Sequence, residues 1–211
     1  MLLSAGLSSR MNPHKAFLDW KGTPLLASQV TCLNLAGFSE IIVVLGHEHK
    51  QLARLIPNIS NVKIAINDSY LAGQTSSIKH GISYLSPETD GVMIVAVDQP
   101  RNITTHQIMS DHLSERHTII TPSYKGIPGH PVLFHKSLIN DLLSIEESSK
   151  GLKHILTRHA SMRYTLDIND PLIPININTM DDYQSALIAT CLLYTSPSPR
   201  DRTRSRMPSS A

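Results

Sequence analysis

Two short runs of the chain, residues 41–45 and 92–97, are almost continuously apolar. Strands buried on both faces of a parallel sheet have this composition, because neither face is left for polar side chains. Weaker apolar runs recur along the chain, at residues 1–5, 62–66, 118–121, 132–134, 164–168 and 173–177. Helical patterns separate these runs. The alternation predicts a three-layer α/β fold, with a mostly parallel central sheet and helices on both of its faces.

Four segments carry signals for the ends of helices. The clearest is Thr179 with Asp182 three residues later, a capping box that predicts a helix through Leu193. A second helix is predicted to begin at Thr23, with Pro24 in its first position and Gly37 at its end. A third begins at Ser76 or Ser77 and runs towards Tyr84. A fourth begins at Thr104 or Thr105 and runs through His112. All four fall between or after the predicted strands, as an α/β fold requires.

Length and composition favour one globular domain, which we expect to occupy residues 1–194. With 211 residues, 41% of them hydrophobic, the chain can form one sizeable core. No apolar run approaches the length of a membrane span and no signal peptide is evident, so we expect a cytoplasmic protein without a membrane partner. Cys32 and Cys191 are too few for a disulfide framework or a four-ligand zinc site.

Residues 195–211 differ from the rest of the chain. They are rich in Ser, Pro and Arg, so we expect a disordered tail. The segment also resembles translated sequencing-adapter read-through, which favours a non-native tail without a functional role; a genuine basic tail is the alternative. The tail holds four arginines and one aspartate, and without it 15 basic and 16 acidic side chains remain. The formal net charge of +2 therefore derives from the tail, and it does not indicate a nucleic-acid partner.

A loop suited to phosphate follows the first apolar run. Gly6 allows the backbone to approach a ligand closely, and the amides around Ser8 and Ser9 can donate to phosphate oxygens. Arg10 and Lys15 supply positive charge. The loop has neither the three glycines of a dinucleotide fingerprint nor the Gly-Lys-Ser/Thr ending of a P-loop. An ordinary strand-to-helix turn with surface cations is the alternative interpretation.

Asp98 follows the apolar run at residues 92–97, so its side chain is expected at the carboxyl end of a strand. In open α/β sheets, ligands gather outside the carboxyl ends of the strands. The loop that contains Lys15 leaves the first strand at the same edge, although 83 positions separate Lys15 from Asp98. A carboxylate beside a phosphate site suits Mg²⁺, which prefers carboxylate and phosphate oxygens. The alternative for Asp98 is a turn or cap aspartate before Pro100.

Five motifs in order resemble those of one family. Residues 3–15, LSAGLSSRMNPHK, resemble the LAAGxSxRMGxxK signature of the MobA-like nucleotidyltransferases, and the molybdenum cofactor cytidylyltransferase branch is the most similar. The other motifs are NDSYLAGQTSSIKHGI at 67–82, DQP at 98–100, GIPGHPVLF at 126–134 and NINTMDDY at 176–183. Together they span residues 1 to about 190, and the ordered set is specific where a single motif is not. The resemblance implies a Rossmann-like nucleotidyltransferase fold.

The resemblance also implies roles for individual residues. Arg10 and Lys15 would bind the triphosphate and Asp98 would bind Mg²⁺, and these three are the expected catalytic residues. Gly129 and His130 would shape the acceptor side. The expected nucleotide-binding residues are Leu3, Ala5, Gly6, Ser8, Ser9, Gly73, Gln74, Ser76 and Ser77. For Ser76 and Ser77 the alternative role is N-capping of a helix, and for His130 it is a structural one.

The sequence departs from the family pattern at four positions. Ser4 and Asn12 replace an alanine and a glycine of the loop. Asn176 and Asn178 stand where this branch commonly has Asp-x-Asp. An asparagine oxygen can still coordinate a metal or orient a metal-bound water, so both remain candidate metal residues, but without negative charge we expect weaker Mg²⁺ binding. Asp98 would then be the principal acidic ligand.

The implied reaction is transfer of a nucleoside monophosphate from a nucleoside triphosphate to a phosphorylated acceptor, with release of pyrophosphate. The resemblance favours CTP as donor and molybdopterin as acceptor, with a molybdoenzyme or its chaperone as protein partner. A guanylyltransferase, a sugar-phosphate nucleotidyltransferase and a non-catalytic nucleotide-binding protein remain alternatives. An NAD-dependent oxidoreductase would share the architecture, but it would need the glycine spacing that this loop does not have.

Overall fold

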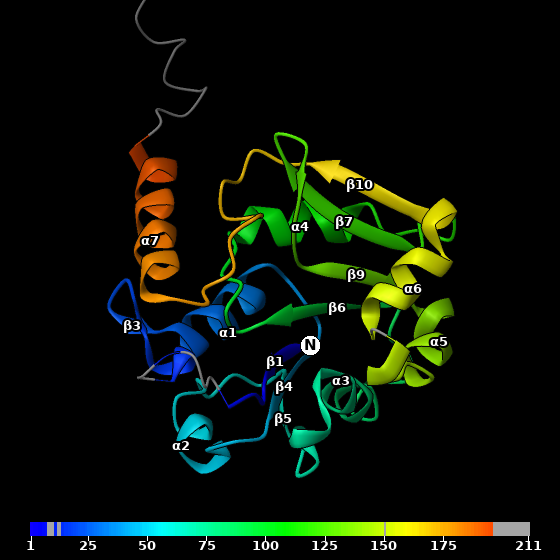
Figure 1. Ribbon diagram of the computed structural model, residues 1–211, viewed down its shortest axis with the longest axis horizontal. Helices are drawn as coiled ribbons and strands as arrows, with labels where there is room; N and C mark the ends of the chain where they lie inside the picture. The colour runs from blue at the N-terminus through cyan, green and yellow to red at the C-terminus, as the bar shows by residue number, and fades with distance from the viewer. Residues whose placement is uncertain (8–10, 12–13, 150, 196–211) are drawn as a thin grey trace, which may run out of the picture.

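The structure is a computed structural model that describes residues 1–7, 11, 14–149 and 151–195. Its centre is an eight-stranded sheet in the order β10-β7-β9-β6-β1-β4-β5, with β8 paired to β7 (Figure 1). The strands are β1 (Leu2–Ser4), β4 (Ile41–Leu45), β5 (Val62–Ile66), β6 (Gly91–Ala96), β7 (Ile119–Tyr124), β8 (Ile127–Pro128), β9 (Val132–His135) and β10 (Arg163–Asp167). The predicted α/β architecture is confirmed.

Most strand pairs of the sheet are parallel. β1 lies between β6 and β4 and is parallel to both, β4 is parallel to β5, and β7 is parallel to β10. Two strands differ: β9 runs antiparallel to both β6 and β7, and the short β8 runs antiparallel to β7. The consequence for function is that the carboxyl ends of β1 and β6 lie side by side.

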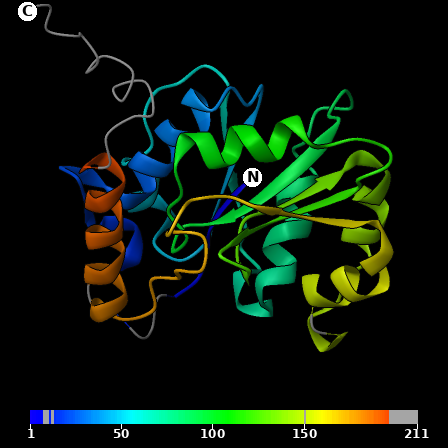
Figure 2. The same ribbon diagram turned by 90° about the horizontal axis from the view of Figure 1, so that it is seen from above.

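Alternate side chains of the central strands enter two separate cores. Along β4, Ile41, Val43 and Leu45 contribute to one core, while Ile42 and Val44 contribute to the other. The first core is covered by α1 (Leu25–Leu35), α2 (His49–Ala53) and α4 (Ile103–Asp111), and the second by α3 (Gln74–Ile82), α5 (Ile139–Leu143) and α6 (Leu152–Arg158). Figure 2 shows the two helical layers on opposite sides of the sheet. Burial on both faces explains why these strands are continuously apolar.

A smaller third core lies beyond the end of the sheet. There α7 (Met180–Thr195) lies beside the short hairpin of β2 (Asp19–Trp20) and β3 (Thr23–Pro24) (Figure 1). Trp20, Tyr183 and Ala186 belong to one buried cluster, in which the rings of Trp20 and Tyr183 are in contact. Short 3₁₀ helices complete the fold: η1 (Lys15–Phe17), η2 (Tyr70–Ala72), η3 (Lys136–Leu138), η4 (Glu147–Ser149) and η5 (Ala160–Met162). Within the described ranges, no helix is both long and apolar enough to cross a bilayer.

Three predicted elements are wrong in detail. Thr23 does not cap α1, because Thr23 and Pro24 form strand β3 and the helix begins at Leu25. α3 begins at Gln74, ahead of the predicted Ser76 or Ser77, because Gly73 supplies the extended, positive-φ residue that precedes it. Residues 173–177 form no strand, and their backbone bonds go to loops. The predicted tail is residues 195–211: Thr195 is the last residue of α7, and residues 196–211 lie outside the described residues.

His106 generates a prediction about stability. Its ring is buried under α4, with Nδ1 3.2 Å from Sδ of Met93. Burial, with a smaller contribution from the charge of Arg101, lowers the pKa of His106 to about 3. The unfolded chain therefore binds a proton below pH 6.5 that the folded chain does not, and stability falls as the pH falls from 6.5 towards 3.

The free energy of unfolding of the wild type should decrease between pH 7.5 and pH 5.5. We expect this decrease to be about 1.4 kcal/mol smaller in His106→Gln, because glutamine does not bind the proton. Urea unfolding of both proteins at the two pH values measures this difference. His112→Gln replaces an exposed histidine at the end of α4 and is the control for loss of an imidazole outside the core. Equal pH dependence of wild type and His106→Gln would contradict the assignment.

Candidate nucleotide site

A cavity of about 300 Å³ opens at the carboxyl ends of β1 and β6. Eight of the predicted site residues line it: Leu3, Ala5, Gly6, Lys15, Gly73, Gln74, Ser77 and Asp98. The sequence motifs that contain them begin far apart along the chain, and the parallel pairing of β1 with β6 brings them together. The predicted convergence of the loop and the carboxylate on one crevice is therefore confirmed for Lys15 and Asp98.

Lys15 and Asp98 form an ion pair at the mouth of this cavity. Nζ of Lys15 donates to Oδ2 of Asp98 at 2.9 Å and to Oδ1 of Asn178 at 3.1 Å. The two charged side chains are only 11% and 25% exposed. One ammonium group thus joins three segments: the loop after β1, the turn after β6 and the segment before α7.

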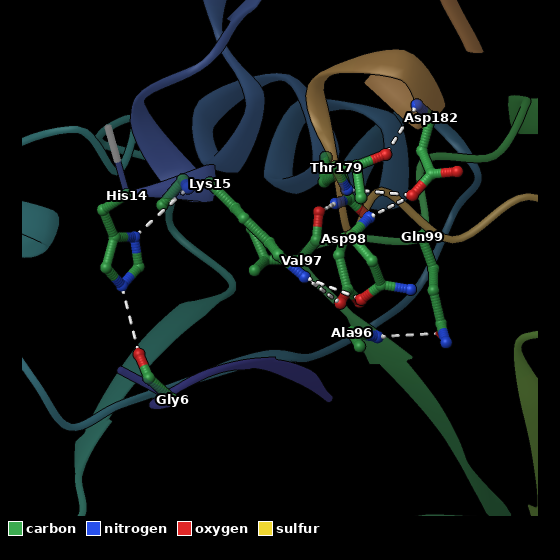
Figure 3. A network of polar contacts seen from close by, with 12 residues as sticks. Gly6, His14, Lys15, Ala96, Val97, Asp98, Gln99, Thr179 and Asp182 are labelled. Atoms are coloured by element: carbon green, nitrogen blue, oxygen red, sulfur yellow. Dashed lines mark hydrogen bonds and ion pairs between the residues drawn. The ribbon is translucent and has the colours of Figure 1, made fainter. Parts of the chain in front are cut away.

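The start of α7 fixes Asn178 next to the ion pair. Figure 3 shows Thr179 and Asp182 at this start. Oδ2 of Asp182 accepts the backbone N–H groups of Asn178 and Thr179, both at 2.9 Å, and the amide of Asp182 donates to Oγ1 of Thr179 at 3.1 Å. The N–H of Asn178 is the largest cause that lowers the pKa of Asp182. The predicted capping box is confirmed. It has a second effect, because it holds the backbone of a residue that contacts Lys15.

The turn after β6 is tied to the same segment. The backbone N–H of Ile177 donates to the carbonyl of Asp98 at 2.8 Å. Asn176 and Asn178 therefore lie on either side of Ile177, the residue whose backbone N–H binds Asp98. Oδ1 of Asn176 is buried without a hydrogen-bond partner among the described residues.

His14 lines the cavity beside Lys15 and was not predicted. The N–H of Ala16 donates to Nδ1 at 3.3 Å, so Nδ1 is unprotonated and Nε2 carries the proton that it donates to the carbonyl of Gly6 at 3.1 Å (Figure 3). Burial is the main cause that lowers the pKa of His14. The neutral ring therefore links both ends of the loop. A lone histidine in a turn carries no pattern that would have identified it in the sequence.

The opposite wall of the cavity is the start of α3, which depends on Gly73. This residue has φ +103°, and a Cβ there would lie 2.5 Å from Cδ of Glu147. Oε2 of Glu147 accepts the backbone N–H of Thr75 at 3.1 Å. Tyr70, which was not predicted, completes this wall. The wall therefore requires glycine at position 73, both for its backbone conformation and for the close approach of Glu147.

Ser76 and Ser77 have different positions. Ser77 lines the cavity, whereas Oγ of Ser76 donates to the carbonyl of Gly73 at 2.8 Å and does not line it. The side-chain amide of Asn67 donates to both hydroxyls at 3.0 Å. Ser76 thus stabilises the turn that presents Gly73 and Gln74.

Gly129 and His130 do not line the cavity. They lie in the loop before β9, where the N–H of Gly129 donates to the carbonyl of Pro122 at 3.0 Å and that of His130 to the carbonyl of Ile173 at 3.4 Å. Burial, followed by the charge of Arg101, lowers the pKa of His130. The structure therefore separates these two residues from the nucleotide wall. Arg10, Ser8 and Ser9 lie outside the described residues, and their predicted roles stay predictions.

The candidate metal ligands offer one carboxylate and two amide oxygens. No group of three or more His, Cys, Asp or Glu side chains in the described part of the chain is arranged to hold a metal ion. Asp98 and Asn178 nevertheless share a cation, the ammonium group of Lys15, and the unpartnered oxygen of Asn176 lies on the same segment. This donor set fits a divalent ion bound jointly with phosphate oxygens, which complete its coordination.

Comparison with known proteins agrees with this geometry. A model of the MobA-like NTP transferase domain matches residues 1–162. The chain is 30% identical over 188 residues to molybdenum cofactor cytidylyltransferase of Escherichia coli, and the match covers 88% of this chain and 93% of that protein.

Solved structures show the same fold. A nucleotidyl transferase from Methanothermobacter has a TM-score of 0.76 at 22% identity, over 92% of this chain and 97% of that one. Rv0371c of Mycobacterium tuberculosis in complex with manganese has a TM-score of 0.70 at 22% identity, over 89% and 96%.

The domain match includes both partners of the central ion pair, Lys15 and Asp98. Enzymes of this kind use a nucleoside triphosphate, a phosphorylated acceptor and a divalent metal ion. The chain belongs to the MobA-like NTP transferase family and is a nucleotidyltransferase.

Proposed function

We propose that this protein transfers cytidine monophosphate from CTP to a molybdopterin-type phosphorylated pterin and releases pyrophosphate. The observation that carries the proposal is the meeting of Lys15 and Asp98 in the lining of a cavity of about 300 Å³ at the carboxyl ends of β1 and β6. The choice of CTP and of the pterin acceptor rests on the 30% identity to the E. coli cytidylyltransferase. A molybdoenzyme or its chaperone would receive the product.

The reaction needs positioning and charge neutralisation more than covalent chemistry. The acceptor phosphate oxygen must approach the α-phosphorus in line with the leaving pyrophosphate. In our proposal Lys15 neutralises the α-phosphate and Arg10 binds the β- and γ-phosphates. His14 donates to the carbonyl of Gly6 and so fixes this residue at the start of the loop. The walls at Leu3–Gly6 and at Gly73–Ser77 hold the base and the ribose.

We propose Mg²⁺ as the metal, held by Asp98 with the oxygens of Asn178 and Asn176. When bound, the ion would neutralise charge on the nucleotide phosphates and orient them. A single carboxylate among the ligands implies weak binding of the metal alone and tighter binding together with the triphosphate. The manganese complex of Rv0371c supports a divalent site in this fold.

Lys15 occupies the space between two of these proposed ligands, so it competes with the metal until the nucleotide attracts its ammonium group. We expect Lys15→Met to bind Mn²⁺ about tenfold more tightly than wild type in the absence of nucleotide, because Asp98 loses its cationic partner. The same substitution should weaken CTP binding. Titration of Mn²⁺ by electron paramagnetic resonance measures the first effect and calorimetry the second.

Lys63→Met is the matched control. Lys63 lies on the edge strand β5, where it pairs with Glu40, so this substitution should leave Mn²⁺ binding unchanged. Unchanged or weaker Mn²⁺ binding by Lys15→Met would contradict the proposed metal position.

The catalytic proposal predicts a large effect at Asp98. We expect Asp98→Ala to lower kcat/KM about 10²–10³-fold, the size of effect seen when a preorganised electrostatic group is removed. Pyrophosphate release with CTP, molybdopterin and Mg²⁺ measures it. Asp111→Ala, at the exposed end of α4, is the control and should keep wild-type rates. Wild-type rates in Asp98→Ala would exclude the assignment.

The same assay with each of the four nucleoside triphosphates tests the donor. We expect CTP to give the highest kcat/KM. A preference for GTP would indicate a guanylyltransferase, and activity with a sugar phosphate in place of the pterin would change the acceptor. Nucleotide binding without pyrophosphate release from any of the four would favour the non-catalytic alternative, which Asn176 and Asn178 make physically reasonable.

A further inference from the structure

Arg101 is a buried arginine whose partners are backbone carbonyls from three segments. Nη1 donates to the carbonyl of Pro100 at 2.7 Å, Nε to that of His130 at 2.7 Å and Nη2 to that of Ile173 at 2.9 Å. The residue is 5% exposed. One planar guanidinium group therefore joins the turn after β6, the loop before β9 and the segment that leads to α7.

The guanidinium group is charged in spite of its burial. Burial lowers the pKa of Arg101 to about 10, while Asp170 and Asp98 act in the opposite direction, so the group carries its proton at neutral pH. Hydrogen bonds from a charged donor are stronger than neutral ones, and the fork of an arginine holds several acceptors in a fixed arrangement. Three backbone carbonyls are thus held at defined positions by one side chain.

The segments joined by Arg101 also contact one another closely. The N–H of His130 donates to the same carbonyl of Ile173 that Arg101 binds. A Cβ on Gly129 would lie 2.0 Å from that oxygen, so the loop can approach only because residue 129 is glycine. Four residues later, Ile177 donates to the carbonyl of Asp98. The contacts form a closed ring that starts and ends at the turn after β6.

We infer that Arg101 is a positioning residue for the acceptor side of the reaction, which sets the loop of Gly129 and His130 against the turn that contains Asp98. The inference rests on the proposed function, because it takes these two loop residues as acceptor-facing. The nucleotide walls belong to other segments, at Leu3–Gly6 and Gly73–Ser77, and Arg101 does not line that cavity. Loss of Arg101 should therefore affect the acceptor more than the nucleotide.

Arg101→Ala and Arg101→Lys test this separation. We expect CTP affinity, measured by calorimetry without acceptor, to stay within about twofold of wild type. The KM for molybdopterin should rise about tenfold or more and kcat should fall, since small misplacements of a binding group are costly. Lysine should not rescue the acceptor KM, because one ammonium group cannot reach three fixed carbonyls in the plane of a guanidinium. Arg158→Ala, an exposed arginine paired with Asp141, is the control.

Chemical rescue provides a second readout. Arg101 also lines a cavity of about 690 Å³ between α1, α4 and α7, through which a small cation can enter. Millimolar ethylguanidinium should restore the kcat/KM for the pterin in Arg101→Ala about fivefold or more, whereas ethylammonium should not. Loss of CTP affinity equal to the rise in acceptor KM would overturn the inference, as would equal rescue by both cations.

Amide hydrogen exchange separates failure of this inference from failure of the proposed function. It needs neither CTP nor pterin. We expect exchange at His130 and Ile177 to be about tenfold faster or more in Arg101→Ala, with exchange in β4 unchanged. If that variant does not fold, Arg101→Lys serves for the same measurement. Unchanged exchange at both amides would overturn the positioning role even in an active enzyme. If exchange is faster in Arg101→Ala but the wild-type protein is inactive towards the pterin, the positioning role of Arg101 stands and molybdopterin is rejected as the acceptor.

Discussion

The contact of Lys15 with Asp98 and Asn178 is the interaction on which the site depends. It requires β1 and β6 to be neighbours with the same direction, because only then do the two loops leave the sheet at one edge. It also requires α7 to begin where it does, since the capping box of Thr179 and Asp182 holds Asn178 in reach. A change in strand order or in the start of α7 would remove one member of the contact. The topology therefore has a direct chemical consequence: a partly buried cation and carboxylate in the lining of one cavity.

His14 contributes to the loop through neutral hydrogen bonds. His14 is kept uncharged by burial, and its two ring nitrogens connect Gly6 with Ala16. A charged imidazole next to Lys15 would oppose its ammonium group. Among the described residues of the loop, the positive charge therefore lies on Lys15, while His14 links Gly6 to Ala16. Asn176 and Asn178 are also uncharged. They offer side-chain oxygens near Asp98 without adding a second negative charge.

The sequence was most informative where one physical constraint acts alone. Strands β4 and β5 were predicted with their observed bounds, β6 was placed within one residue, and the capping box at Thr179 was identified from two side chains, because burial and capping each leave a local pattern. The convergence of Lys15 and Asp98 was also predictable, since the edge of a parallel sheet follows from strand direction.

Features that depend on long-range partners could not be predicted. Ile173, Ile175 and Ile177 alternate as in a strand, but the carbonyl of Ile173 is bound by Arg101 and His130, and the N–H of Ile177 by Asp98, so no ladder forms. α3 begins at Gln74, ahead of the predicted Ser76 or Ser77, where the carboxylate of Glu147 accepts the N–H of Thr75, 72 positions away. His14 and Arg101 have ordinary local surroundings in the sequence, and their importance lies in carbonyls contributed by other segments.

The most direct test of the account is the position of a metal in a complex with nucleotide. A crystal structure with Mn²⁺ and a non-hydrolysable CTP analogue, with anomalous diffraction to locate the ion, provides it. We predict manganese between the carboxylate of Asp98 and the triphosphate, with Nζ of Lys15 moved from Asp98 to a phosphate oxygen. Manganese bound elsewhere, or Lys15 still paired with Asp98 beside a bound triphosphate, would contradict the central claim.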